Sequence, residues 1–235
     1  MNEITVSWVT CANRAEAEKI ADALENARRK KIATLPPDVN RSAAHFDIER
    51  DGAEKAVRHG LAALRGVGTG QAIKIVEERE AHGPFRSLAD LVERCRASIN
   101  KKILTSLIRA GALDNLHDNR AAMEAAVPPL LLDASRKKAD DAVGQGSLFD
   151  FAPQKAINEA PDLPDVPDWS ENERLMKQFD IVGFFIGGHP IASMRSVLNR
   201  RRDSYYIKDL ITPSGQLPRD VRIGCIILDS IFKTT

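Results

Sequence analysis

The hydrophobic and polar positions between residues 61 and 75 follow the repeat of two short helices. An apolar helical turn runs into Gly66-Val67-Gly68, and a second helical stretch begins immediately after the second glycine. Apolar residues at helical spacing on either side of the turn would share one side of the pair, because residues three and four apart are neighbours on a helix. They are Leu61, Leu64, Val67, Ala72 and Ile75. The pattern predicts two helices packed across a tight glycine turn.

This turn has the composition of a helix-hairpin-helix, a module that grips the sugar-phosphate backbone of DNA. Its glycines permit a positive φ and let the backbone approach a phosphate closely. The following helix would direct its N-terminal N–H groups and the positive end of its dipole at that phosphate. The predicted DNA contacts are Arg65, Gly66, Val67, Gly68, Thr69, Gly70, Lys74, Lys101 and Lys102.

These residues also admit other interpretations. Gly-x-Gly also occurs in plain helix–helix turns. A dinucleotide-binding fingerprint is not indicated, because no β-branched strand run precedes the turn and the third glycine of that pattern is missing. For Lys101 and Lys102, a solvated helix start is the alternative to a phosphate contact.

Upstream of the turn, the pattern predicts one helix and a small amount of β structure. Residues 13–31 carry apolar side chains at helical spacing, with a basic run in the last turn. Residues 32–35 form a predicted short strand stopped by two prolines. Residues 46–57 form a predicted hairpin that turns at Asp51-Gly52.

Downstream of the turn, capping residues divide the chain into further helices. Gly83-Pro84 ends the second helix of the motif, and Ser87 with Asp90 begins the next helix as a capping box. Asn100 caps a helix that Gly111 ends. We expect these helices to pack as one compact domain.

The periodic pattern is interrupted and then lost toward the middle of the chain. Residues 118–126 and 130–141 are predicted as two helices separated by Pro128-Pro129. From about residue 144 to residue 168 no period is present, and Pro and Asp recur. This composition predicts a mobile linker.

The last part of the chain contains a helix and an isolated strand. Ser170 and Glu173 form a capping box that opens a helix through Phe179. Residues 221–227 have the pattern of a β-strand. A single strand is not stable by itself, so we expect the chain to be part of a longer polypeptide.

Composition and charge narrow the classes of function. The 235 residues carry a net charge of +1, so overall charge does not indicate a nucleic-acid partner. Between Leu61 and Ala110, however, nine Lys and Arg accompany five acids, a local excess that suits phosphate binding. Cys11, Cys95 and Cys225 lack metal-ligand spacing. No metal site, signal peptide or membrane span is predicted, and the expected location is cytoplasmic.

Several further blocks follow one another along the chain. They are Leu35-Pro36-Pro37-Asp38-Val39-Asn40, Arg58-His59-Gly60-Leu61, Gly83-Pro84-Phe85-Arg86-Ser87-Leu88-Ala89-Asp90, Asn100-Lys101-Lys102, Leu107-Ile108-Arg109-Ala110-Gly111-Ala112-Leu113-Asp114, Gln145-Gly146-Ser147-Leu148-Phe149, Gly183-Phe184-Phe185 and Gly188-His189-Pro190. In this order, and with the glycine turn, they resemble the C-terminal half of the bacterial DNA polymerase III alpha subunit, a family C replicative polymerase. The resemblance covers roughly residues 20–230.

The resemblance implies a mainly α-helical fold in four regions. Residues 1–60 look like the end of the fingers, with Arg58 facing template or nucleotide. Residues 61–143 look like a helix-hairpin-helix DNA-binding domain. Residues 144–168 look like a linker with a sliding-clamp motif, and residues 169–235 like a helical segment leading into the first strand of an incomplete OB-type β-barrel.

The resemblance also implies what this chain does by itself. The family's catalytic palm, with its Mg²⁺-binding aspartates, precedes the matching region, so we predict no catalytic residue, no cofactor and no polymerase activity in this chain alone. The expected partners are duplex DNA, bound nonspecifically and with strong salt dependence, the sliding clamp, and the rest of the alpha subunit or other replisome subunits.

The expected clamp motif comprises Gln145, Ser147, Leu148 and Phe149. Gln145 would hydrogen-bond at the rim of a pocket that Leu148 and Phe149 fill. A flexible segment binds weakly, but holding the same DNA as the clamp raises its effective concentration. The alternative is that Leu148 and Phe149 fold back onto a helical surface of their own chain.

Three other classes of protein remain as alternatives. A helix-hairpin-helix repair enzyme would use an aspartate about twenty residues after the hairpin, where Asp90 lies, but Asp90 already serves as the predicted capping partner of Ser87. A non-enzymatic accessory protein would occupy DNA or clamp without a palm. A truncated gene product would expose apolar surface and dissolve poorly.

Overall fold

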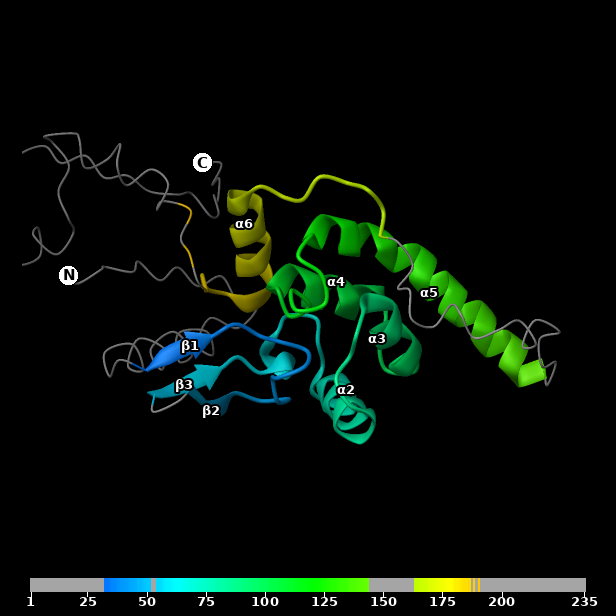
Figure 1. Cartoon of the computed structure of the whole chain (residues 1–235), viewed down its shortest axis with the longest axis horizontal. Helices are drawn as coiled ribbons and strands as arrows, with labels where there is room; N and C mark the ends of the chain where they lie inside the picture. The colour runs from blue at the N-terminus through cyan, green and yellow to red at the C-terminus, as the bar shows by residue number, and fades with distance from the viewer. Residues whose placement is uncertain (1–31, 52–53, 144–162, 187, 189, 191–235) are drawn as a thin grey trace, which may run out of the picture.

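The computed structural model describes residues 32–51, 54–143, 163–186, 188 and 190. Within these ranges a small sheet is followed by a larger helical body (Figure 1). The elements are β1 (Ala33–Leu35), β2 (Asp47–Asp51), β3 (Glu54–Arg58), the 3₁₀ turn η1 (Leu61–Ala63), α2 (Thr69–His82), α3 (Leu88–Arg94), α4 (Lys101–Ala110), α5 (Arg120–Val143) and α6 (Glu171–Val182). The expected mainly helical class is confirmed.

The sheet contains three strands in the order β1-β3-β2. Val57 of β3 lies opposite Ile48 in the antiparallel pair with β2 and opposite Thr34 in the parallel pair with β1. The predicted strand and hairpin are therefore confirmed, but the turn is not at Asp51-Gly52, because Asp51 is the last residue of β2 and pairs with Glu54. The carboxylate of Glu49 pairs with the guanidinium groups of Arg58 and Arg41, which ties β2 to β3 and to the loop before it.

His59 connects the sheet to the helical body. Its side chain is 1% exposed and lies beside the rings of Phe46 and Phe184, with ring centroids 4.6 and 5.8 Å away. Burial lowers the pKa of His59 from 6.5 to about 4, so the imidazole is neutral at neutral pH. Neutral Nδ1–H then donates to the Gly60 carbonyl at 2.9 Å.

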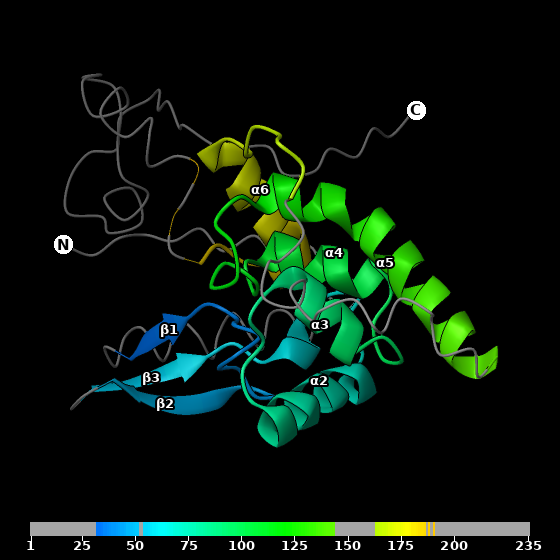
Figure 2. The same cartoon turned by 45° about the vertical axis from the view of Figure 1, so that its right-hand side comes forward.

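The helical body is built around α4. This helix packs against both α5 and α6, and α5 also contacts α3 (Figures 1 and 2). The buried face of α4 includes Ile103, Leu104, Leu107 and Ile108. Each buried aliphatic side chain of this size contributes about 1.5–3 kcal/mol, so α4 supplies much of the stability of the body.

The predicted capping residues begin α3 and α4. Ser87 Oγ accepts from the Asp90 amide at 3.1 Å, and Asn100 Oδ1 accepts from the Ile103 amide at 3.0 Å. The first capping box is only half formed, because the Asp90 carboxylate accepts from the Arg86 amide, at 2.9 Å. Both helices therefore begin at the predicted residues.

Helix α6 forms the complete capping box that the sequence predicts. Ser170 Oγ accepts from the Glu173 amide, and the Glu173 carboxylate accepts from the Ser170 amide at 2.9 Å. The helix runs three residues beyond Phe179, to Val182, and ends at Gly183 with a φ of 88°. Glycine adopts this left-handed conformation at no steric cost.

The boundaries predicted around Pro128-Pro129 were wrong. Instead of two helices, α5 is one continuous helix with both prolines inside it. Each proline removes an amide donor and disfavours helix at the preceding residue. Buried Val127 and half-buried Leu131, on either side of the pair, pack against the same core. This shared packing outweighs the local cost of the prolines.

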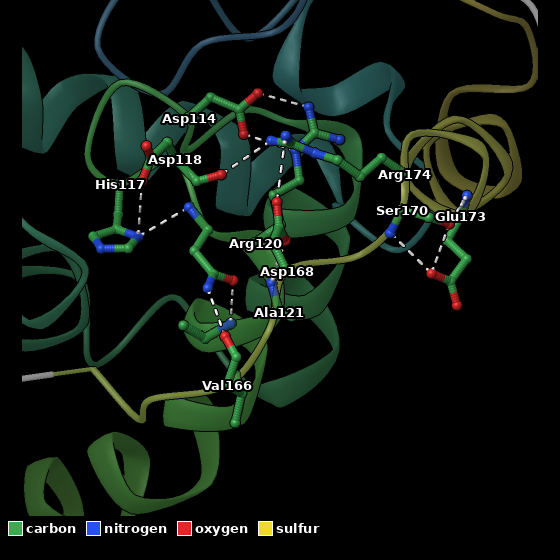
Figure 3. Close-up of polar contacts among 12 residues, drawn as sticks. Asp114, His117, Asp118, Arg120, Ala121, Val166, Asp168, Ser170, Glu173 and Arg174 are labelled. Carbon is green, nitrogen blue, oxygen red and sulfur yellow. Dashed lines mark hydrogen bonds and ion pairs between the residues drawn. The ribbon is translucent and has the colours of Figure 1, made fainter. Parts of the chain in front are cut away.

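The end of the predicted linker is held against the start of α5. The Val166 carbonyl accepts from Asn119 Nδ2 at 2.8 Å, and Asp168 Oδ1 accepts from the Ala121 amide at 3.2 Å (Figure 3). The predicted helix 13–31, the rest of the linker and the strand 221–227 lie outside the described residues. Within the described ranges, no helix has the length and apolarity to cross a membrane.

Candidate DNA-backbone interface

The glycine turn has the geometry of a helical hairpin. The first helical segment is the single 3₁₀ turn η1, and the chain reverses at Gly66, whose φ is +90°. Val67 is 5% exposed, and its amide donates to the Leu64 carbonyl at 3.0 Å. Val67 therefore packs in the apolar core, as its spacing with Leu61, Leu64, Ala72 and Ile75 predicts. Gly68, in contrast to Gly66, has an extended conformation with a φ of −76°.

The start of α2 differs from the starts of the other described α-helices. α3, α4 and α6 begin with Ser87, Asn100 and Ser170, each of which accepts a first-turn amide. The N-cap of α2 is Gly68, which has no side chain that could accept a hydrogen bond from a first-turn amide. Gly68, Thr69 and Gly70 are exposed. The first turn of α2 therefore lies at an open surface, with the carboxamide oxygen of Gln71 beside Gly68, and an external anion there can accept from its amides.

A cation from α4 lies beside this turn. A Cβ built on Gly66 would lie 3.2 Å from Cε of Lys102 and 2.8 Å from Oγ of Ser106. The stem of Lys102 therefore crosses Gly66, while Ser106 is buried beneath it. The structure joins Lys102 to the hairpin even though 36 residues separate it from Gly66 in the sequence. Ser106 was not predicted, although its spacing of four from Lys102 places both on one face of α4.

The local cations divide into an exposed group and an internal group. The exposed group contains Arg65, Lys74, Arg86, Arg96, Lys101 and Lys102. The internal group bonds to neighbouring elements: Arg79 donates to the Val39 and Ser42 carbonyls, Arg94 pairs with Glu78, and Arg109 pairs with Glu124. The count of nine basic residues thus overstates the charge available to a ligand. This division depends on tertiary contacts, which the sequence count could not contain.

The remaining predicted site residues lie elsewhere. Arg58 is 6% exposed and donates to the Pro36 carbonyl at 2.9 Å in addition to its pairing with Glu49. Its guanidinium is thus part of the sheet and does not face the hairpin surface. The expected clamp residues Gln145, Ser147, Leu148 and Phe149 lie outside the described residues.

Two chemical alternatives find little support in the geometry. The carboxylate of Asp90, the candidate for a repair enzyme, accepts from Arg86 and lies 3.4 Å from Nη1 of Arg94. Among the described residues no cluster of His, Cys, Asp or Glu is arranged to hold a metal ion. Cys95 is buried, which raises the pKa of its thiol to about 11 and keeps it protonated.

Comparison with known proteins gives the class and then the family. Residues 31–123 match the family described as "Helix-hairpin-helix motif", which defines the hairpin and the helices around it as that class of module. The chain is 36% identical over 189 residues to the DNA polymerase III subunit alpha of Caulobacter vibrioides, covering 80% of this chain and 16% of that protein. It is 37% identical over 179 residues to the DNA polymerase III subunit alpha of Thermus aquaticus, covering 76% of this chain and 14% of that protein.

A third relative extends the match along the chain. The DNA polymerase III subunit alpha of Vibrio cholerae is 29% identical over 237 residues, covering 94% of this chain and 20% of that protein. The chain is thus a relative of one segment of DNA polymerase III subunit alpha. It spans about a sixth of the length of these relatives.

Proposed function

We propose that this chain is a DNA-holding segment of a replicative DNA polymerase alpha subunit. In this proposal the hairpin binds duplex DNA through phosphates without sequence preference, and residues 145–149 dock on the sliding clamp. Nucleotide addition and its Mg²⁺ belong to the palm of the full-length relatives, and the proposed partners are DNA, the clamp and other replisome subunits.

The open start of α2 carries the DNA-binding part of this proposal. A phosphate oxygen would accept from the first-turn amides, and the helix dipole would favour its negative charge. Backbone donors make no contact with base edges, so such binding is independent of sequence. The exposed cations around the turn would contribute the salt-dependent part of the affinity.

Lys102 and Lys101 provide a matched pair for testing the site. Both are exposed residues in the first turn of α4, but only Lys102 lies across Gly66. We expect Lys102→Ala to weaken duplex binding several-fold and to lower the slope of log K against log salt by about 1. Lys101→Ala is expected to change the affinity less than twofold. Fluorescence anisotropy titrations between 50 and 200 mM salt would measure both variants. Equal losses in the two variants would contradict a site centred on the hairpin.

The clamp part of the proposal needs a separate measurement. We expect the purified chain to bind a bacterial sliding clamp with a micromolar Kd, as suits a short linear motif of a few anchor side chains. A variant with Gln145, Leu148 and Phe149 replaced by Ala should lose that binding and keep its DNA affinity. A well-folded chain that does not bind the clamp would remove the clamp from the proposal and leave the DNA site.

A further inference from the structure

The two halves of α5 are held very differently by the rest of the molecule. The first half, residues 120–127, is fixed at its start by the strap of residues 163–168 (Figure 3). It is fixed along its length by the pairing of Glu124 with Arg109 of α4. Met123 and Val127 are at most 1% exposed. This half is therefore part of the core.

The second half has much weaker support. It extends past α3 and away from the body, as the two views show (Figures 1 and 2). Leu132 is 53% exposed, and Asp133, Ser135 and Arg136 are exposed as well. Among residues 130–136, the part of this half whose side chains the structure describes, the half-buried Leu130, Leu131 and Ala134 reach the core.

The proline pair lies at the junction between the halves. Pro128 and Pro129 are both exposed, and neither has an amide hydrogen. The carbonyls of Glu124 and Ala125 consequently lose their ordinary helical partners. Because the pair is on the solvent side, water can satisfy these carbonyls at little cost. Two consecutive missing hydrogen bonds are among the recognised causes of a helix bend.

We propose that Pro128-Pro129 is a joint at which the second half of α5 changes its direction relative to the helical body. The first half stays fixed because its contacts are buried and ionic, whereas the second half moves because the junction lacks the two helical hydrogen bonds that Pro128 and Pro129 cannot donate. Since the chain continues from Val143, the angle at the joint sets where the following residues begin. This proposal is independent of the proposed DNA and clamp binding.

The joint can be tested by measuring a distance across it. Spin labels at Ala97→Cys, after α3, and Ser135→Cys, on the second half, report the position of that half relative to the body; both sites are exposed. Cys11, Cys95 and Cys225 are replaced by Ala so that only these two sites are labelled. We expect double electron–electron resonance to give a broad distance distribution, and Pro128→Ala/Pro129→Ala to narrow it.

A second variant separates the joint from general helix strengthening. Asp133→Ala/Arg136→Ala removes an exposed ion pair with an N–O distance of 3.7 Å, raises helix propensity in the same half and restores no hydrogen bond across the junction. We expect this control to keep the broad distribution. Hydrogen exchange should show the amides of residues 130–133 becoming about tenfold slower in the proline variant and unchanged in the control. An equally broad distribution and equal exchange in the proline variant would overturn the proposal.

Discussion

Gly66→Ala is expected to destabilise the chain by about 2–3 kcal/mol and to weaken duplex DNA binding at least tenfold. Two effects act together. The φ of +90° is one that alanine rarely adopts, and the added Cβ would lie 2.8 Å from Oγ of the buried Ser106. The turn must shift to relieve this contact, and the stem of Lys102 must move with it. Urea unfolding and anisotropy titrations would measure the two effects.

Gly70→Ala is the matched comparison for the stability part of this prediction. Gly70 lies in the first turn of α2, and a Cβ there would meet no atom within 4 Å. We expect this variant to gain about 0.5–1 kcal/mol of stability, because alanine has less conformational freedom to lose than glycine. If the phosphate approaches this turn closely, Gly70→Ala weakens binding in a more stable protein. A stable Gly66→Ala variant with normal binding would contradict the hairpin as the DNA site.

Stability is expected to fall by up to about 3 kcal/mol between pH 6.5 and pH 4 because of His59. The unfolded chain protonates this side chain near its ordinary pKa of 6.5, whereas burial lowers the pKa in the folded chain to about 4. Between these values the unfolded state binds more protons, so acid favours unfolding. Above pH 6.5 neither state is protonated at His59, so its titration no longer lowers the stability.

The contribution of His59 can be isolated by comparing slopes. His59→Gln retains an amide that can donate to the Gly60 carbonyl but does not titrate in this range. We expect the free energy of unfolding of His59→Gln to depend less steeply on pH between 6.5 and 4 than that of the unchanged chain. His45→Gln, at an exposed position, is the control and should keep the original slope. Identical slopes in all three proteins would refute the assignment.

Local signals in the sequence were sufficient for the helix starts and for the turn. Ser87, Asn100 and Ser170 begin helices because their side chains satisfy nearby amides, an interaction confined to a few residues. Gly66 reverses the chain for a similarly local reason. The prediction of two separate helices was wrong at Pro128-Pro129, because packing against the core outweighs the local preference of proline to end a helix.

The composition of the candidate site required tertiary information. Arg79 and Arg94 belong to the local excess of basic residues in the sequence, but they bond to carbonyls and carboxylates of neighbouring elements. Lys102 is indistinguishable from Lys101 by position along α4, and only the packing of α4 against the turn separates them. Long-range contacts of this kind do not produce a periodic pattern in the sequence.

The end of α4 has a consequence for any attempt to dissect the protein into smaller pieces. The Ala110 carbonyl accepts from Nε2 of Gln178 at 2.9 Å, and the Arg109 carbonyl accepts from Nη1 of Arg120 at 3.3 Å. The first donor comes from α6, 68 residues further along the chain. A fragment cut to the boundaries of the helix-hairpin-helix match would lose that donor and expose the face of α4 that α6 covers. The smallest unit that preserves the hairpin therefore has to extend through α6.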